Sequence, residues 1–161
     1  MVRVNEKKEG ALAALQDAVD EATAYFARVN ANLYDGYQTA HEVLAQLVFW
    51  HRQHVRVARM LLVGQAPDLL TGTRPALNRA ACAERRTMTM ADLVDQLADQ
   101  QRELDTLLRE LPDWTIDFPI KQGGRPCTVE DRVLALATGI NNHVAQFRRA
   151  AVARQTRSTL N

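Results

Sequence analysis

The chain has 161 residues, of which 47% are hydrophobic and 24% are charged, and its formal net charge is +1 at pH 7. This length and composition are typical of one globular domain that buries its own hydrophobic core. A net charge so close to zero argues against proteins that hold nucleic acid or an anionic membrane surface, so we expect neither partner.

The sequence also argues against membrane-spanning and secreted proteins. It has no run of eighteen apolar residues, and its charged start, "MVRVNEKKEG", is not followed by the apolar segment of a secretory signal. The two cysteines, Cys82 and Cys127, do not resemble a disulfide framework. We therefore expect a cytoplasmic protein with a single domain over residues 1–151, followed by a polar tail, 152–161, that frays.

Two long helices are predicted in the first 64 residues. Apolar residues recur at steps of three and four over 5–33, and the segment "YDGY" then breaks the pattern. The next helix begins at Thr39, which forms a capping-box pattern with Glu42, and it runs to Gly64. A loop with two prolines follows, and residues 76–86 allow a short additional helix.

The second half of the chain predicts two more long helices. One starts near Thr89 and ends before Pro112, and the other opens at Thr128. The connection between them is irregular, with room for a short extended piece at "WTIDF". No strand-period pattern is long enough for a sheet, so we predict an all-α, antiparallel four-helix bundle. The long second connection permits a crossover, which gives an up-down-down-up order.

The stretch "LAQLVFWH", residues 44–51, places polar side chains in an otherwise apolar helix. Steps of about 100° per residue put His41 and three arginines toward water, and Trp50 and His54 toward the bundle, with Gln46 and His51 on its flanks. The three arginines are Arg52, Arg56 and Arg59. Buried polar groups need partners, which leaves two interpretations open: hydrogen bonds within the core, or a ligand pocket between helices.

The last predicted helix carries one histidine on the flank of its apolar face. His143 shares that flank with Gly139, one turn earlier. A glycine within a helix costs about 1 kcal/mol relative to alanine. We expect it to leave a small gap beside His143.

Three segments resemble the DinB-like superfamily: "TAHEVLAQLVFWHRQHV", "PDWTIDFP" and "GINNHVAQFRR". The closest resemblance is to its DfsB-type branch, which includes colibactin self-resistance proteins, and it covers residues 5–151. The resemblance implies an up-down-down-up four-helix bundle that is often dimeric. In the metal-binding members, one histidine of the second helix and two of the last helix, spaced HxxxH, hold a divalent ion.

Aligned by that pattern, the three ligand positions fall on Gln46, Gly139 and His143, so one of three histidines is kept. Three imidazoles suit zinc or nickel, whereas one imidazole beside a neutral amide does not. We therefore expect no native metal and no cofactor. Glu42 or His54 could rebuild a site with His143, although no spacing requires it.

The leading hypothesis is a protein that binds a small organic molecule in the inter-helix cavity. Its predicted lining residues are Gln46, Trp50, His54, Gly139 and His143. A second hypothesis is a metal- or thiol-dependent hydrolase or transferase that acts on reactive electrophiles, with His143 as base or ligand. A third is a structural homodimer without pocket chemistry, because large apolar helix faces favour self-association. We expect a homodimer, and whether the chain is an enzyme stays open.

Overall fold

The computed structural model describes residues 2–160, and helices dominate it. The helices are α1 (Val2–Phe26), α2 (Ala40–Leu62), α3 (Arg74–Glu84), α4 (Met90–Glu110) and α5 (Val129–Thr159). The strands are β1 (Asp117–Phe118) and β2 (Cys127–Thr128). They pair antiparallel, Asp117 with Thr128 and Phe118 with Cys127. The extended piece predicted at "WTIDF" is therefore present, and it pairs with the residues that lead into α5.

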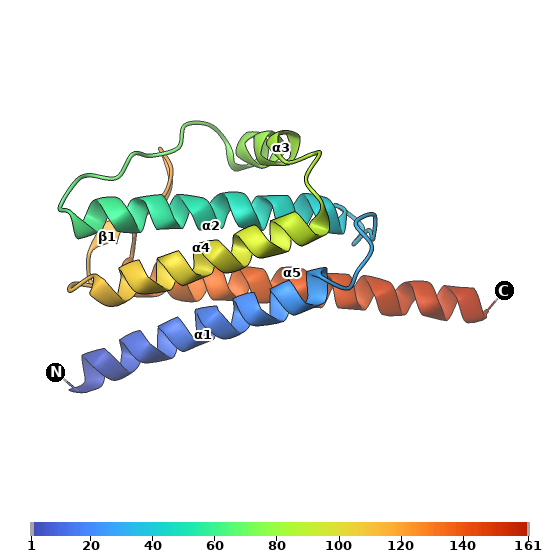
Figure 1. The fold of residues 1–161 in the computed structure, drawn as a ribbon, viewed down its shortest axis with the longest axis horizontal. Helices are drawn as coiled ribbons and strands as arrows, with labels where there is room; N and C mark the ends of the chain where they lie inside the picture. The colour runs from blue at the N-terminus through green and yellow to red at the C-terminus, as the bar shows by residue number, and fades with distance from the viewer. Residues whose placement is uncertain (1, 161) are drawn as a thin grey trace.

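The four long helices form the predicted bundle. In Figure 1, α1 and α5 run in one direction while α2 and α4 run in the other, which is the up-down-down-up order. The connection from α2 returns along the bundle to α3, and α4 then starts at the same end as α2. The principal helix contacts are α2 with α4 and α1 with α5. This crossover places α3 against the outer side of α2, where it covers polar positions that would otherwise face water.

The helix starts lie where the sequence predicts them. Thr39 accepts a hydrogen bond from the Glu42 backbone at 3.2 Å, and the Glu42 carboxylate accepts one from the Thr39 backbone at 3.2 Å. Thr89 forms the same reciprocal pair with Asp92 at the start of α4, and the Thr128 side chain accepts from the Asp131 backbone at the start of α5. These caps satisfy donors that the first helical turn leaves free.

The predicted end of the first helix is wrong. α1 ends at Phe26, and the chain then turns, with the Arg28 N–H bonded to the Tyr25 carbonyl at 3.1 Å in a tighter turn. The Asn30 side chain accepts from the Asn32 backbone at 2.8 Å, which competes with helical hydrogen bonding. Leu33 still packs against the core, so the apolar spacing continued past the true helix end.

The other end of the chain differs from expectation as well. Residues 152–159 are exposed, as a polar tail should be, but they continue α5 as a helix rather than fray. This segment contains no glycine or proline to stop the helix. It extends beyond the bundle in Figure 1. None of the helices within residues 2–160 has the apolar length needed to cross a bilayer.

α2 is covered by neighbouring segments over more of its circumference than its amphipathic pattern predicts. Arg52, Arg56 and Arg59 are exposed as expected, but His41 is half-buried and its Nε2 lies 2.7 Å from the Met88 carbonyl. His51, placed on a flank by the sequence, is fully buried and faces α4. Cover from α3 and from the turn before α4 explains why His41 is not solvated.

Candidate functional site

A cavity of about 220 Å³ lies between α2, the start of α3 and α5. Four of the five predicted site residues line it: Trp50, His54, Gly139 and His143. Two arginines that were not predicted from the sequence, Arg74 and Arg132, complete its polar wall. Its apolar wall includes Leu47, Ile120, Leu136 and Ile140.

The fifth predicted residue, Gln46, lies elsewhere. It lines a separate cavity of about 560 Å³ between α2 and α3. Its Nε2 donates to the Cys82 Sγ at 3.6 Å, and this thiol lies 3.5 Å from the Glu42 carbonyl oxygen. The side chain is 6% exposed, so it does point inward, but toward α3 and not toward His143.

Trp50 forms the wall between these two cavities. Its Nε1 donates to Asn78 Oδ1 at 2.8 Å, and Asn78 belongs to the α2–α3 cavity. The Arg74 guanidinium lies 4.4 Å from the centre of the indole ring, within the range of a cation–π contact. The start of α3 therefore fixes both the indole and one cationic group of the 220 Å³ cavity.

His54, which lines the cavity, keeps one ring nitrogen unprotonated. Its Nδ1 lies 2.6 Å from the Trp50 carbonyl oxygen, which can only accept, so Nδ1 carries the proton. Nε2 is then an acceptor, and it is inaccessible to solvent and has no hydrogen-bond partner within residues 2–160. Burial lowers the pKa of His54 to about 3, and the positive charges of Arg132 and Arg74 act in the same direction. At neutral pH the ring is neutral.

Arg132 holds a cationic group beside His54. Its Nη2 donates to the carbonyls of Phe118 at 3.1 Å and Arg125 at 3.3 Å, and its guanidinium lies 5.6 Å from the Phe118 ring centre. Its Nε is buried and has no partner in the described part of the chain. The ion pairs within residues 2–160 involve other arginines, so neither Arg132 nor Arg74 has a carboxylate partner there.

His143 and Gly139 occupy the α5 side. Burial lowers the pKa of His143, the Asp35 carboxylate raises it, and Arg74 lowers it. Asp35 does not line the cavity, and its Oδ1 accepts from two backbone N–H groups of its own turn. A Cβ added at Gly139 would meet nothing within 4 Å. The gap predicted beside His143 is therefore present.

Four basic side chains and no carboxylate line this cavity. Burial also lowers the pKa of Arg74, and the nearby charge of Arg132 adds to this effect. Two guanidinium groups in a confined space repel one another. A bound anion would stabilise them, whereas binding of a cation would be unfavourable. The chemistry that this arrangement favours is recognition of negative charge.

The side chains present do not fit the divalent-metal site expected from the resemblance to the DinB-like superfamily. Gly139 offers no donor, Gln46 is bonded to Cys82 in the other cavity, and the Glu42 carboxylate caps α2. His54 does lie with His143, but beside two arginines. Within residues 2–160, no three His, Cys, Asp or Glu side chains are grouped to hold a metal ion.

The two arginines differ in how far the sequence could have revealed them. Arg132 precedes Leu136, Gly139 and His143 by four, seven and eleven residues, so all four share one helical stripe. Extending the stripe N-terminally from His143 would have found Arg132. Arg74 reaches the cavity only through the crossover and α3, and no local spacing indicates this.

Comparison with known proteins supports the fold. The crystal structure of the mycothiol-dependent maleylpyruvate isomerase matches with a TM-score of 0.71 and 14% sequence identity, covering 87% of this chain and 60% of the isomerase. A histidine-to-alanine mutant of that enzyme gives a TM-score of 0.70 at 14% identity, with the same coverage. The chain thus spans 60% of the length of these structures.

Sequence comparisons add no assignment. Neither a scan against protein-family models nor a search of curated proteins finds a match. At 14% identity the structural likeness shows the fold alone, and the narrower resemblance to the DfsB-type branch stays a prediction. The chain is a helical bundle whose fold resembles that of the maleylpyruvate isomerase.

Proposed function

We propose that this protein binds a small organic anion in the cavity between α2, α3 and α5. The observation that carries the proposal is that Arg74 and Arg132 line one 220 Å³ cavity, without a lining carboxylate and without ion-pair partners in residues 2–160. Charges in a partly dry site are unfavourable unless they are paired. A carboxylate matches the planar donors of a guanidinium group, and it would pair with both.

The size and walls of the cavity favour a small carboxylic acid. Pockets for drug-sized ligands occupy about 300–1,000 Å³, so a volume of about 220 Å³ suits a ligand with few heavy atoms. The Trp50 ring and the Leu47, Ile120 and Ile140 side chains supply apolar contact area for its carbon skeleton.

Binding has better support than proton transfer or thiol chemistry. A base with a pKa of about 3, as in His54, is far from the range near neutral pH that makes general-base catalysis effective. Cys127 is not among the lining residues, and Cys82 lines the α2–α3 cavity. The two remaining hypotheses, a hydrolase or transferase and a structural homodimer, have no comparable observation in their favour.

A matched pair of ligands tests the proposal. We would titrate 3-methylbutanoate and its neutral amide, 3-methylbutanamide, into the protein at constant ionic strength, and follow the ring ¹⁵N signals of His54 and His143 by NMR. Constant ionic strength removes the screening effect of added salt. We expect saturable shifts with the acid and at least about tenfold weaker binding of the amide, because it lacks the charge that the guanidinium groups recognise.

Variants locate the binding. Arg132→Gln removes one charge from the cavity. It should weaken binding of 3-methylbutanoate by about tenfold or more, since hydrogen bonds to charged groups contribute about 1.5–3 kcal/mol. Arg56→Gln removes an exposed charge from the outer face of α2, and it should bind as the unaltered protein does. The proposal would be refuted if the protein bound the acid and the amide with equal affinity, or if both variants lost the same affinity for the acid.

A further inference from the structure

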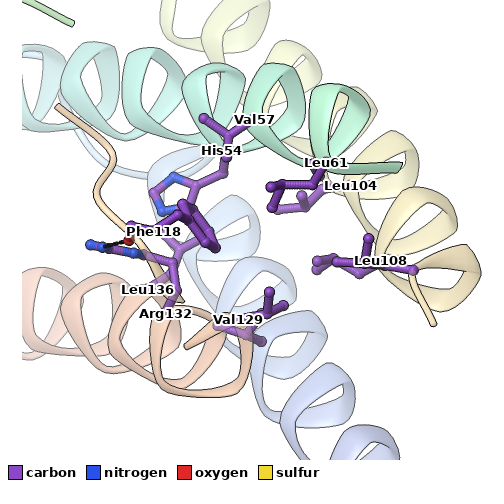
Figure 2. A pocket seen from close by; sticks show the side chains of 12 residues that line it. His54, Val57, Leu61, Leu104, Leu108, Phe118, Val129, Arg132 and Leu136 are labelled. Atoms are coloured by element: carbon purple, nitrogen blue, oxygen red, sulfur yellow. Dashed lines mark hydrogen bonds between the residues drawn. The ribbon is translucent and has the colours of Figure 1, made fainter. Parts of the chain in front are cut away.

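A second, apolar cavity adjoins the candidate anion site. It measures about 20 Å³ and shares three lining residues with that site: His54, Arg132 and Leu136. Figure 2 shows it from close by, with His54 and Phe118 on one side and Leu104 and Leu108 of α4 on the other. The remaining lining side chains are aliphatic. The two cavities therefore meet at a common wall.

The small cavity suits an alkyl group rather than water. One water molecule requires a cavity of roughly 10–15 Å³, together with two to four polar partners. The volume is therefore sufficient for one small group, but most of the lining offers carbon alone. Apolar cavities of this kind stay dry and accept apolar groups.

The shared wall also carries two unmet hydrogen-bonding requirements of opposite kind. Arg132 Nε–H is a buried donor without an acceptor, and His54 Nε2 is a buried acceptor without a donor. The bond from Nδ1 to the Trp50 carbonyl keeps Nε2 in the acceptor state. A carboxylate alone would accept a hydrogen bond from Arg132 Nε–H and leave His54 Nε2 without a donor. A ligand that also carries a hydroxyl next to the carboxylate would donate to His54 Nε2 as well.

Resting on the proposed anion-binding function, we infer that the ligand is a 2-hydroxycarboxylate with a short alkyl substituent. Its carboxylate pairs with Arg132 and Arg74, its hydroxyl donates to His54 Nε2, and its alkyl group enters the small cavity between Phe118 and Leu108. One ligand thereby meets the charge, the unpaired acceptor and the apolar space at once.

Three acids separate these contributions without any change to the protein. 2-Hydroxy-3-methylbutanoate carries all three features, 3-methylbutanoate lacks the hydroxyl, and glycolate lacks the alkyl group. Calorimetric titration should show the first acid binding at least about tenfold more tightly than the second, because an unmet buried acceptor is costly. The first acid should also bind at least about tenfold more tightly than glycolate, because it buries alkyl carbons that glycolate lacks.

Two variants assign the differences to residues. His54→Phe removes the acceptor, so the hydroxy acid should then bind no more tightly than 3-methylbutanoate. Val133→Ile adds one methyl group at a residue that lines only the small cavity, and it should weaken the branched hydroxy acid while leaving glycolate unchanged.

The outcomes distinguish this inference from the proposal on which it rests. If 3-methylbutanoate binds and the hydroxy acid gains nothing, the hydroxycarboxylate assignment is wrong and anion binding stands. If glycolate binds as tightly as the branched hydroxy acid, the alkyl assignment is wrong. If none of the three acids binds, both the inference and the proposed function are overturned.

Discussion

His54 Nδ1 lies 2.6 Å from the carbonyl oxygen of Trp50, one helical turn earlier. This hydrogen bond decides which ring nitrogen carries the proton, because the carbonyl can accept only from a protonated Nδ1. We predict that ¹⁵N NMR will show the Nδ1–H tautomer of His54, with no titration between pH 5 and 8, since burial lowers its pKa to about 3. An Nε2–H tautomer, or a pKa near 6.5, would contradict this geometry.

Anion binding should raise the pKa of His54. Arg132 and Arg74 contribute to lowering it, and a bound carboxylate would offset their charge. At pH 7, where the acid is ionised, the expected observation is a saturable shift of the His54 ring ¹⁵N signals with 3-methylbutanoate and none with its amide. His54 ring signals that do not respond to the acid at pH 7 would place the ligand away from this ring.

Stability should fall with acidification before most carboxylates titrate. Burial lowers the pKa of His51 to about 4, and those of His54 and His143 are also lowered. The neutral rings favour the folded state fully above pH 6.5, and this contribution is lost as the pH falls toward 4, because only the unfolded chain protonates readily. His51 alone should remove about 2 kcal/mol of unfolding free energy between pH 7 and 5.

Urea unfolding at pH 7, 6 and 5 measures this loss. The double variant His51→Leu/Gln101→Leu lacks the buried ring and should lose less stability over the same interval. Equal pH dependence in the variant and the unaltered protein would show that His51 is not the responsible group.

The buried pair His51 and Gln101 should behave as one unit. His51 Nε2 lies 2.7 Å from Gln101 Oε1, and the side chains are 0% and 1% exposed. Replacing one partner leaves a buried polar group unmet, so Gln101→Leu should destabilise the protein by about 1–3 kcal/mol. The double variant to leucine should recover much of that loss. Losses that simply add in a double-mutant cycle would contradict coupling between the two.

Gly139 offers a test of the cavity that leaves its charges in place. Gly139→Ala should stabilise α5 by about 0.5–1 kcal/mol, because its Cβ meets nothing within 4 Å and alanine favours the helix. Gly139→Leu should fill the cavity and abolish binding of 3-methylbutanoate, with the thermal midpoint of unfolding preserved. Undiminished binding by this variant would show that the acid binds elsewhere.

The sequence predicted the bundle because helix periodicity and capping are local. Thr39, Thr89 and Thr128 mark the helix starts, and all three cap α-helices in the structure. The ends were harder to place. The apolar spacing continues past Phe26 to Leu33, which reaches the core through a turn. The polar composition of residues 152–159 suggested a frayed tail, although the segment lacks a glycine or proline that would stop α5.

The site was only partly predictable for a physical reason. Trp50 and His54 share one helical face of α2, and Gly139 and His143 one face of α5, so the helical spacing placed all four where they line one cavity. Gln46 lies about 80° around the helix from His54. Its side chain therefore points toward α3, and α3 separates it from the cavity that His54 lines. Arg74 comes from the crossover itself, and its position depends on how the whole chain folds.

The most direct test is a crystal structure of the protein with 3-methylbutanoate at a concentration well above its measured Kd. We predict a carboxylate within hydrogen-bonding distance of Arg132 Nε, with Arg74 on its other side. A ligand bound in the α2–α3 cavity beside Gln46, or a 220 Å³ cavity that holds only water under saturating conditions, would contradict it.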